Sequence, residues 1–187
     1  MRSAAAFALL LAAFAAIAQR PEPPNGILLV AKPSLVDPNF RETVVLVTQA
    51  PDGSTVGVVL NRPTSVNSEK SREPIYAGGP VMREVLVTLF ASDSVPRAPA
   101  FHVTQGVYLS MHPANGDPAS RRLRIFTGFA GWAPGQLQSE LQLDAWLVLP
   151  VTEDLLFRTD TRGLWKELIE KARGSRADVR IGDRLCS

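Results

Sequence analysis

Cysteine and histidine are scarce in this chain of 187 residues, which contains one Cys and two His. A single Cys cannot close a disulfide within the chain, and it excludes structural metal sites that use several thiolates. The two His are not clustered with acidic residues, so the sequence predicts no metal site. Nucleotide-binding loops, dinucleotide fingerprints and nucleophile elbows are absent as well, and we therefore expect no cofactor.

An excess of charge of one sign is also missing. The 20 Lys and Arg nearly balance the 18 Asp and Glu, and the formal net charge is +2. Bulk basicity therefore gives no support for a nucleic-acid partner. The most basic stretch, residues 171–184, has no aromatic residues interleaved for base stacking, and we expect residues 175–187 to form a polar tail.

Apolar residues are most concentrated at the N-terminus. Arg2 precedes an uninterrupted apolar block from Ala4 to Ala18, which ends in a small-x-small pattern. This arrangement is typical of a secretory signal peptide, and the block is shorter than the roughly 20 residues of a membrane-spanning helix. The sequence thus predicts a signal peptide over residues 1–18, a Pro-rich linker over 19–25, and export to the periplasm or the medium. An apolar first helix of a cytoplasmic protein is the alternative.

The remaining residues, 26–174, are predicted to form one domain with many short strands. Runs rich in β-branched residues are separated by turn residues, and Pro51-Asp52-Gly53-Ser54 predicts a hairpin over residues 43–61. Residues 64–74 have almost no apolar anchor, and we expect a polar loop there. Strands are expected at residues 26–31, 43–48, 55–61, 86–91, 106–110, 123–127 and 146–150.

Two helices are expected late in the chain. Pro134 near the start, with Leu137 and Leu141 one turn apart, predicts a helix over residues 134–141. Residues 161–172 show the clearest helical period, with one apolar stripe and one charged face. The fold class that follows is α+β: a single domain with a strongly bent, barrel-like mixed β-sheet and a few helices, the clearest near the C-terminal end.

Glycines and aromatic residues gather where a strand is expected to pass into the first helix. Gln136 and Glu140 lie one helical turn apart, so they share a face close to Trp132. Aromatic walls, backbone donors and this polar pair together predict a pocket for a small ligand. A tightly packed corner, with Trp132 in the core, is the alternative. The candidate pocket residues are Asn61, Arg62, Gly78, Gly79, Trp132, Gln136 and Glu140.

Two further sequence patterns favour a structural role over a binding or catalytic role. Gly78-Gly79-Pro80 lacks a following Lys and Ser/Thr, so a tight turn is a better interpretation than an anion-binding loop. Ser110 and His112 share one face of a strand, but about 7 Å separates alternate Cα atoms, and no nearby acid can be assigned to orient the imidazole. We therefore assign no catalytic residue.

Several short motifs follow one another along the chain. They are Ala31-x-Pro33-x-Leu35-x-Asp37-Pro38-x-Phe40-x-x-Thr43-Val44-Val45, Gly57-x-x-x-Asn61-Arg62-Pro63, Gly78-Gly79-Pro80-Val81, Gly131-Trp132-x-x-Gly135-Gln136-Leu137-x-x-Glu140, and Trp146 with Leu156-Phe157 and Trp165. In this order they resemble the YqgE/AlgH family of bacterial proteins, over about residues 26–172. The resemblance implies an α+β domain with a strongly bent sheet and no established reaction. Some members are named as regulators of transcription or of exopolysaccharide synthesis.

The chain differs from this family pattern in three respects. Members usually begin near the first strand and are cytoplasmic, the connections at 64–74 and 111–122 are short here, and Phe90 stands where many members have a His. We therefore expect an exported binding or accessory domain without enzymatic activity, with a small ligand or a protein as its partner. A hydrolase with a site near Trp132 and a cytoplasmic transcriptional regulator are the alternatives.

Overall fold

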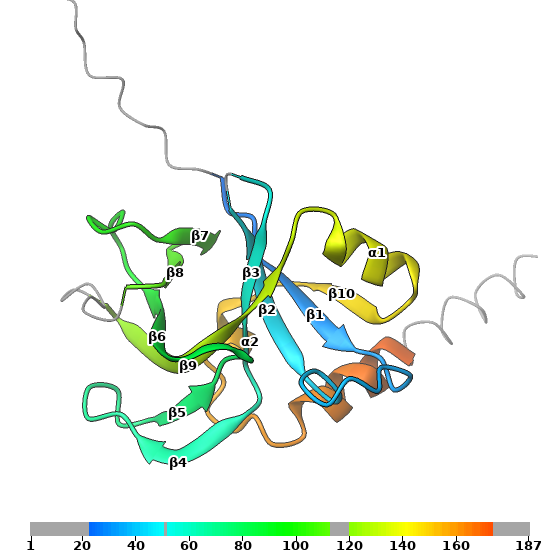
Figure 1. Cartoon of the computed structure of the whole chain (residues 1–187). Helices are drawn as coiled ribbons and strands as arrows, with labels where there is room; N and C mark the ends of the chain where they lie inside the picture. The colour runs from blue at the N-terminus through cyan, green and yellow to red at the C-terminus, as the bar shows by residue number, and fades with distance from the viewer. Residues whose placement is uncertain (1–22, 51, 113–119, 174–187) are drawn as a thin grey trace, which may run out of the picture.

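The computed structural model describes residues 23–50, 52–112 and 120–173, which form a ten-stranded sheet with three helices (Figure 1). The predicted signal peptide (1–18) and polar tail (175–187) lie outside the described residues. The strands are β1 (Ile27–Ala31), β2 (Val44–Gln49), β3 (Thr55–Val59), β4 (Pro63–Asn67), β5 (Pro74–Ala77), β6 (Val81–Ala91), β7 (Phe101–Thr104), β8 (Val107–Ser110), β9 (Arg122–Trp132) and β10 (Trp146–Pro150). The helices are α1 (Gln136–Gln142), α2 (Glu153–Leu156) and a C-terminal helix over residues 164–173.

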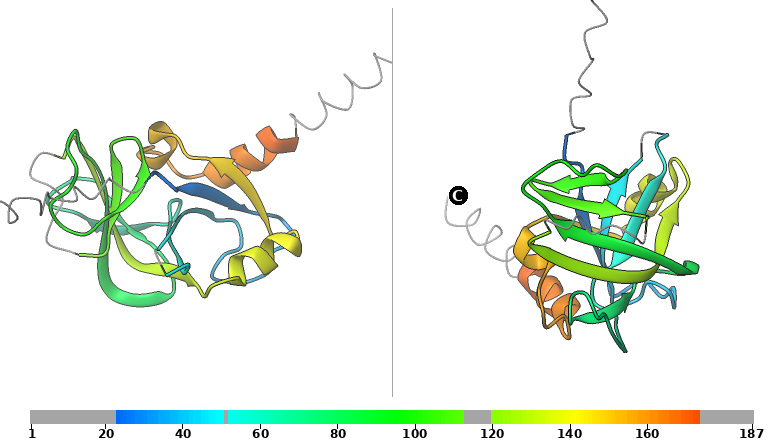
Figure 2. Two further views of the ribbon diagram at one scale, coloured as in Figure 1. Left: turned by 90° about the horizontal axis from the view of Figure 1, so that it is seen from above. Right: turned by 90° about the vertical axis from the view of Figure 1, so that its left-hand side faces the viewer.

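The sheet is strongly bent (Figures 1 and 2). Its main path runs β10-β1-β2-β3-β9-β6-β8-β7 with antiparallel neighbours, while β5 pairs in parallel with β9 and antiparallel with β4. The N–H groups of Asn25 and Gly26 donate to the carbonyl oxygens of His102 and Val103, at 3.1 and 2.9 Å. The last strand of the path, β7, therefore returns to the chain just before β1. The predicted α+β domain with a bent mixed sheet is confirmed.

Strands β1 and β2 are buried on both faces. In β1, Leu28 and Val30 point into the larger core, whereas Leu29 and Ala31 point into a second core on the other face of the sheet. Strands buried on both sides appear in a sequence as continuous apolar runs without alternation, as these two do. The continuous run of β1 thus reflects two cores separated by one sheet.

The helices cover these two cores. Leu137 of α1 packs into the second core, and Leu156 of α2 packs into the larger one. The C-terminal helix adds its apolar stripe of Leu164, Leu168 and Ile169 to the larger core, as its period predicted. Among the described residues, no helix combines the length and the hydrophobicity that crossing a membrane requires.

The prediction of a polar loop over residues 64–74 is wrong. Strand β4 and the first residue of β5 lie there and form an antiparallel hairpin. Most of β4 is exposed, so no apolar alternation marks it in the sequence. Strand β7 is likewise missing from the predicted set. Strand β6 is longer than predicted because its first four residues are exposed, and β9 is longer because it continues through Gly128 and Gly131, a residue type that is rare in strands.

A buried arginine connects the sheet to the C-terminal segment. Arg124 of β9 is fully buried, and its guanidinium lies 4.6 Å from the centroid of the Tyr76 ring. It donates to the carbonyl oxygens of Leu156 and Arg158 at 2.9 and 2.7 Å, and to the Glu73 carboxylate at 3.3 Å. Four groups from two segments of the chain, residues 73–76 and 156–158, therefore surround one buried cation, which is the condition under which a buried charge is tolerated.

Gly78 and Gly79 allow two backbone segments to approach each other closely. A Cβ atom on Gly78 would lie 2.3 Å from the carbonyl oxygen of Gly128, and one on Gly79 would lie 2.2 Å from the carbonyl carbon and oxygen of Phe129. Backbone atoms cannot give way as the end of a side chain can. The glycine pair is therefore required for the path between β5 and β6 to cross β9.

Replacing Gly79 by alanine should destabilise the fold by about 3 kcal/mol, the upper end of what overpacking costs, because the methyl group meets the backbone of Phe129. Gly131→Ala is the matched control, since its Cβ would make only an ordinary contact of 3.6 Å. Urea unfolding of both variants measures the difference. Equal stability of the two variants would contradict the close crossing.

Candidate functional site

The structure brings Trp132, Gln136 and Glu140 together at the end of β9. The Glu140 carboxylate accepts the indole N–H of Trp132 at 3.0 Å and that of Trp146 at 2.9 Å. It also accepts the side-chain amide of Gln136 at 3.1 Å, and the Gln136 carbonyl accepts the N–H of Ala133 at 3.2 Å. Every polar group of this predicted pair is thus bonded within the protein.

Phe40 completes this corner. Its ring is stacked on Trp132 and meets Trp146 edge-on, with centroids 5.8 Å apart in both pairs. Both tryptophans are 4% exposed, so the aromatic residues form part of the second core. We call Phe40, Trp132, Gln136, Glu140 and Trp146 the indole–carboxylate cluster.

Asn61 and Arg62 act on the loop that carries Phe40. Asn61 accepts the N–H of Val44 and donates to the Glu42 carbonyl oxygen, both at 2.9 Å. Arg62 donates to the carbonyl oxygens of Asn39 and Arg41, at 2.7 and 3.3 Å. Burial, with a smaller contribution from the charge of Arg41, lowers the pKa of Arg62. These two residues therefore hold the loop on both sides of Phe40, and no hydrogen bond joins them to Gln136 or Glu140.

The glycine pair lies elsewhere, at the crossing of β9. The Gly78 N–H donates to the Thr127 carbonyl oxygen at 2.8 Å, and the Gly78 carbonyl oxygen accepts the N–H of Val59. The N–H of Gly78 is therefore committed to the sheet. The structure thus places the predicted pocket residues in three different settings: the packed cluster, the contacts that hold the loop around Phe40, and the backbone crossing at β9. A ligand role for them stays a prediction.

Ser110 and His112 do not form a nucleophile and base pair. The Ser110 hydroxyl is buried and donates to the Pro99 carbonyl oxygen at 3.2 Å, while the backbone N–H of His112 donates to the same hydroxyl. The His112 residue is exposed, as expected for a surface histidine.

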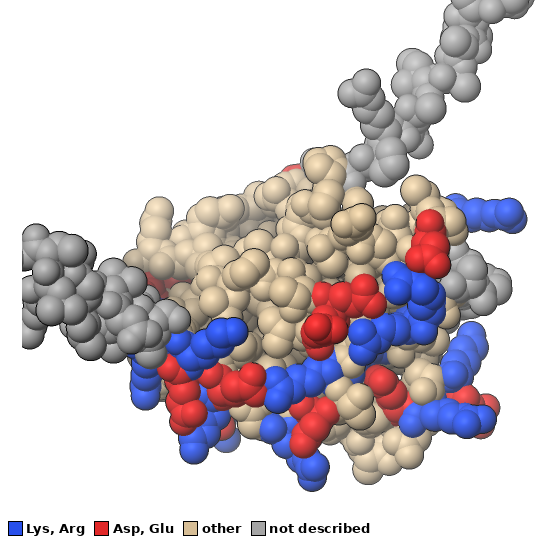
Figure 3. Space-filling view, turned by 180° about the vertical axis from the view of Figure 1, so that it is seen from behind, with Lys and Arg blue, Asp and Glu red and all other residues tan. Residues whose placement is uncertain are grey.

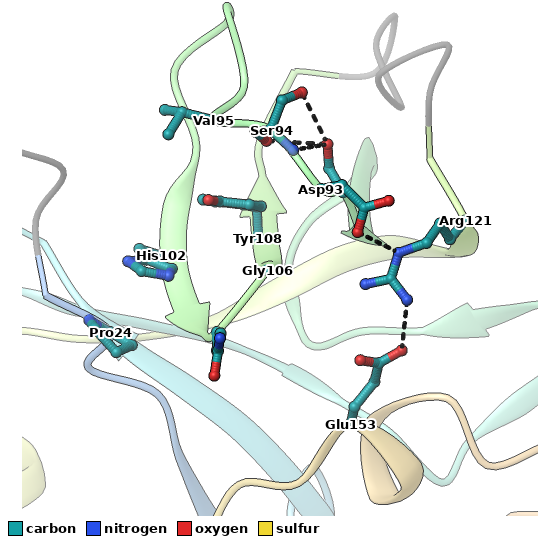
Figure 4. Close-up of a pocket in the computed structure, with 11 residues that line it drawn as sticks. Pro24, Asp93, Ser94, Val95, His102, Gly106, Tyr108, Arg121 and Glu153 are labelled. Atoms are coloured by element: carbon teal, nitrogen blue, oxygen red, sulfur yellow. Dashed lines mark hydrogen bonds and ion pairs between the residues drawn. The ribbon is translucent and has the colours of Figure 1, made fainter.

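A cleft of about 670 Å³ lies on the other side of the molecule from α1, beside β7 and β8 (Figures 1 and 4). Its lining comes from five separate parts of the chain, which is why no local motif marks it in the sequence. Its polar and aromatic lining includes Asp93, Ser94, His102, Tyr108, Arg121 and Glu153.

One wall of the cleft is formed by rings (Figure 4). His102 and Tyr108 are opposite each other on β7 and β8, and their rings stack at 5.1 Å with an interplanar angle of 18°. Tyr108 stacks in turn on the buried ring of Phe90, at 5.8 Å. Phe90 thus supports the His102 side of the cleft from within the core, and it does not itself reach the cleft lining.

The facing wall carries charges of both signs. The Arg121 guanidinium lies 2.9 Å from the Asp93 carboxylate and 3.9 Å from that of Glu153. The same Glu153 carboxylate lies 3.6 Å from Arg122. All these side chains keep substantial exposure, so they are accessible to a ligand and pair only weakly with one another.

Within the part of the chain that the structure describes, no group of three or more His, Cys, Asp and Glu residues is placed to hold a metal ion. The lining of the cleft offers hydrogen bonds, charge and ring faces to a ligand.

The fold defines a class of single α+β domains built on one strongly bent sheet. A family model described as AlgH-like matches residues 28–177, so the chain belongs to this family, as its motifs predict. UPF0301 proteins of Thermobifida fusca and Streptomyces coelicolor are 36% and 37% identical to it, and each match covers 83% of this chain and 90% of the relative.

Two solved structures share the fold. The AlgH protein of Pseudomonas aeruginosa has a TM-score of 0.60 at 26% identity, over 87% of this chain and 91% of that one. A protein of Corynebacterium diphtheriae has a TM-score of 0.66 at 24% identity, over 82% and 89% of the two chains.

The indole–carboxylate cluster predicts a large effect of Glu140→Leu. Removing the carboxylate leaves two buried indole N–H groups without an acceptor, and we expect a loss of about 2–4 kcal/mol in the free energy of unfolding. Glu170→Leu, on the exposed face of the C-terminal helix, is the control and should change stability by less than about 0.5 kcal/mol. Denaturant unfolding followed by tryptophan fluorescence measures both, and a neutral Glu140→Leu would show that the indoles need no carboxylate.

Proposed function

We propose that this chain is an exported binding domain without catalytic activity, and that its ligand occupies the cleft beside β7 and β8. The main support is that the two walls of the cleft differ. One wall has stacked rings, and the other has accessible charges of both signs. The polar groups of the indole–carboxylate cluster are used in packing, which favours the cleft over that corner.

The charged wall favours a small zwitterion such as an amino acid or a short peptide. Asp93 and Glu153 can pair with an ammonium group, and Arg121 can pair with a carboxylate. The His102 ring gives an apolar face for the rest of the molecule. A ligand with one charge only would engage charges of only one sign on this wall.

Backbone NMR spectra recorded while the dipeptide L-alanyl-L-alanine is added test this assignment. We expect shifts confined to residues 92–95, 102–108, 121 and 153, and at least a tenfold weaker affinity for Arg121→Ala because a charge-assisted pair is lost. Arg97→Ala, an exposed arginine outside the cleft lining, is the control and should bind as the parent does.

Three outcomes would contradict the proposal. Shifts centred on residues 131–140 would move the site to the indole–carboxylate cluster, and the lack of any shift at millimolar dipeptide would remove zwitterions as the ligand class. Cleavage of the dipeptide, followed by mass spectrometry, would favour the hydrolase alternative.

Export is proposed from the N-terminal sequence pattern. The protein isolated from its own host should lack residues 1–18, with Gln19 as its first residue, because small residues at 16 and 18 suit a signal peptidase. Intact-mass measurement of the native protein checks this. The double substitution Ala16→Tyr with Ala18→Tyr should block the cleavage, and a native protein that retains Met1 would contradict export by this route.

A further inference from the structure

The cleft beside β7 and β8 has an apolar side as well as a charged one (Figure 4). In that view the apolar side lies to the left, and the charges of Asp93, Arg121 and Glu153 lie to the right. Four lining residues make up the apolar side, and we call them the apolar subsite: Pro24, Val95, His102 and Tyr108. Val95 is 59% exposed, so part of this surface is in contact with solvent.

The subsite is built on a row of rings that crosses three neighbouring strands. Phe90 of β6 is opposite Tyr108 of β8, which in turn is opposite His102 of β7. Opposite side chains share one face of the sheet, and these rings stack with interplanar angles of 29° and 18°. Phe90 is 1% exposed, Tyr108 is 7% exposed and His102 is half-buried. The row of rings therefore leads from the interior of the protein into the cleft.

Two exposed aliphatic residues flank the rings. Figure 4 shows Val95 above Tyr108, and Pro24 below His102. Pro24 is held at this place because the N–H of the next residue, Asn25, donates to the His102 carbonyl oxygen at 3.1 Å. Rings and aliphatic side chains grouped in this way are the usual lining for the apolar part of a ligand.

Gly106 brings the apolar subsite close to the charged wall. It lies in the turn between β7 and β8, two residues before Tyr108, and Figure 4 draws it on the side of Tyr108 that faces Arg121. A Cβ atom at Gly106 would lie 3.7 Å from a guanidinium nitrogen of Arg121. A ligand carboxylate paired with Arg121 therefore has its neighbouring atoms beside the apolar subsite.

Long-range charge does little to select the ligand. The formal net charge is +2, and Figure 3, which shows the molecule from behind, has positive and negative side chains interleaved along its lower part. A surface of mixed charge attracts neither anions nor cations from a distance. What distinguishes one zwitterion from another is thus the side chain that meets the apolar subsite.

Building on the proposed zwitterion site, we infer that the apolar subsite selects ligands with an aromatic side chain, such as a dipeptide that ends in phenylalanine. The carboxylate of that residue pairs with Arg121, and its ring packs against the rings of the subsite. The ammonium group then meets Asp93 or Glu153, whose carboxylates lie 2.9 and 3.9 Å from the same guanidinium.

An aromatic ring fits this subsite better than an aliphatic group of the same size. The faces and edges of aromatic rings carry opposite partial charges, so a pair of rings contributes more than the apolar area that it buries. His102 is the ring to change, because it is half-buried and outside the two core clusters. His102→Leu keeps an apolar side chain and removes the ring.

NMR titrations with three dipeptides test the inference: L-alanyl-L-alanine, L-alanyl-L-phenylalanine and L-alanyl-L-cyclohexylalanine. For the parent protein we expect the phenylalanine dipeptide to bind at least about tenfold more tightly than the alanine dipeptide, and at least about threefold more tightly than the cyclohexylalanine dipeptide. His102→Leu should bind the phenylalanine and cyclohexylalanine dipeptides equally. His112→Leu, at an exposed histidine outside the cleft lining, is the matched control and should keep the preference of the parent.

Equal binding of the phenylalanine and alanine dipeptides would overturn the apolar subsite. Equal binding of the phenylalanine and cyclohexylalanine dipeptides by the parent, or a full aromatic preference in His102→Leu, would overturn selection by the rings. Each of these results leaves the zwitterion site in place, because the alanine dipeptide still binds, whereas failure of all three dipeptides to bind would overturn the proposed function as well. The comparison within the parent protein needs no substitution, and circular dichroism checks that His102→Leu keeps the fold.

Discussion

The carboxylate of Glu140 is the interaction on which this half of the molecule depends. It holds the indole N–H groups of Trp132, from β9 in the middle of the main path of the sheet, and of Trp146, from β10 at the end of that path. Phe40 packs against both rings, and Asn61 and Arg62 fix the loop on either side of it. One carboxylate thus fixes the relative positions of α1, β10 and the loop that carries Phe40.

This arrangement explains why residues that look chemically active in the sequence serve packing in the structure. A Gln and a Glu one helical turn apart beside tryptophans are equally suited to a pocket or to satisfying buried donors, because both need acceptors near aromatic rings. The spacing predicts that Gln136 and Glu140 lie together, and they do. It carries no information on Trp146 and Phe40, whose contacts depend on the tertiary fold.

The sequence predicts those parts of the fold whose burial produces a periodic or continuous apolar pattern. Strands β1, β2, β3 and β10 and the C-terminal helix are strongly apolar or strongly periodic, and the sequence places them within a few residues. The exposed hairpin of β4 and β5 leaves no such trace. Arg124 is a charged residue in a predicted strand, and nothing local shows that Glu73, Tyr76 and two carbonyl oxygens enclose it.

The cleft is separate from the packed cluster. The cleft joins Asp93, His102, Arg121 and Glu153, residues too irregularly spaced to form a motif. In this AlgH-like chain, the motif residues Trp132, Glu140 and Trp146 pack against one another, and the cleft proposed for binding lies outside the motifs.

The Glu140 carboxylate holds both indoles in a closed cluster, and the exchange of the indole N–H protons with D₂O, followed by NMR, tests this arrangement most directly. We expect the Trp132 and Trp146 indole protons to exchange at least about 100-fold more slowly than in the urea-unfolded chain, since their exchange requires the cluster to open. Exchange of both protons as fast as in the unfolded chain would show that Glu140 does not hold them.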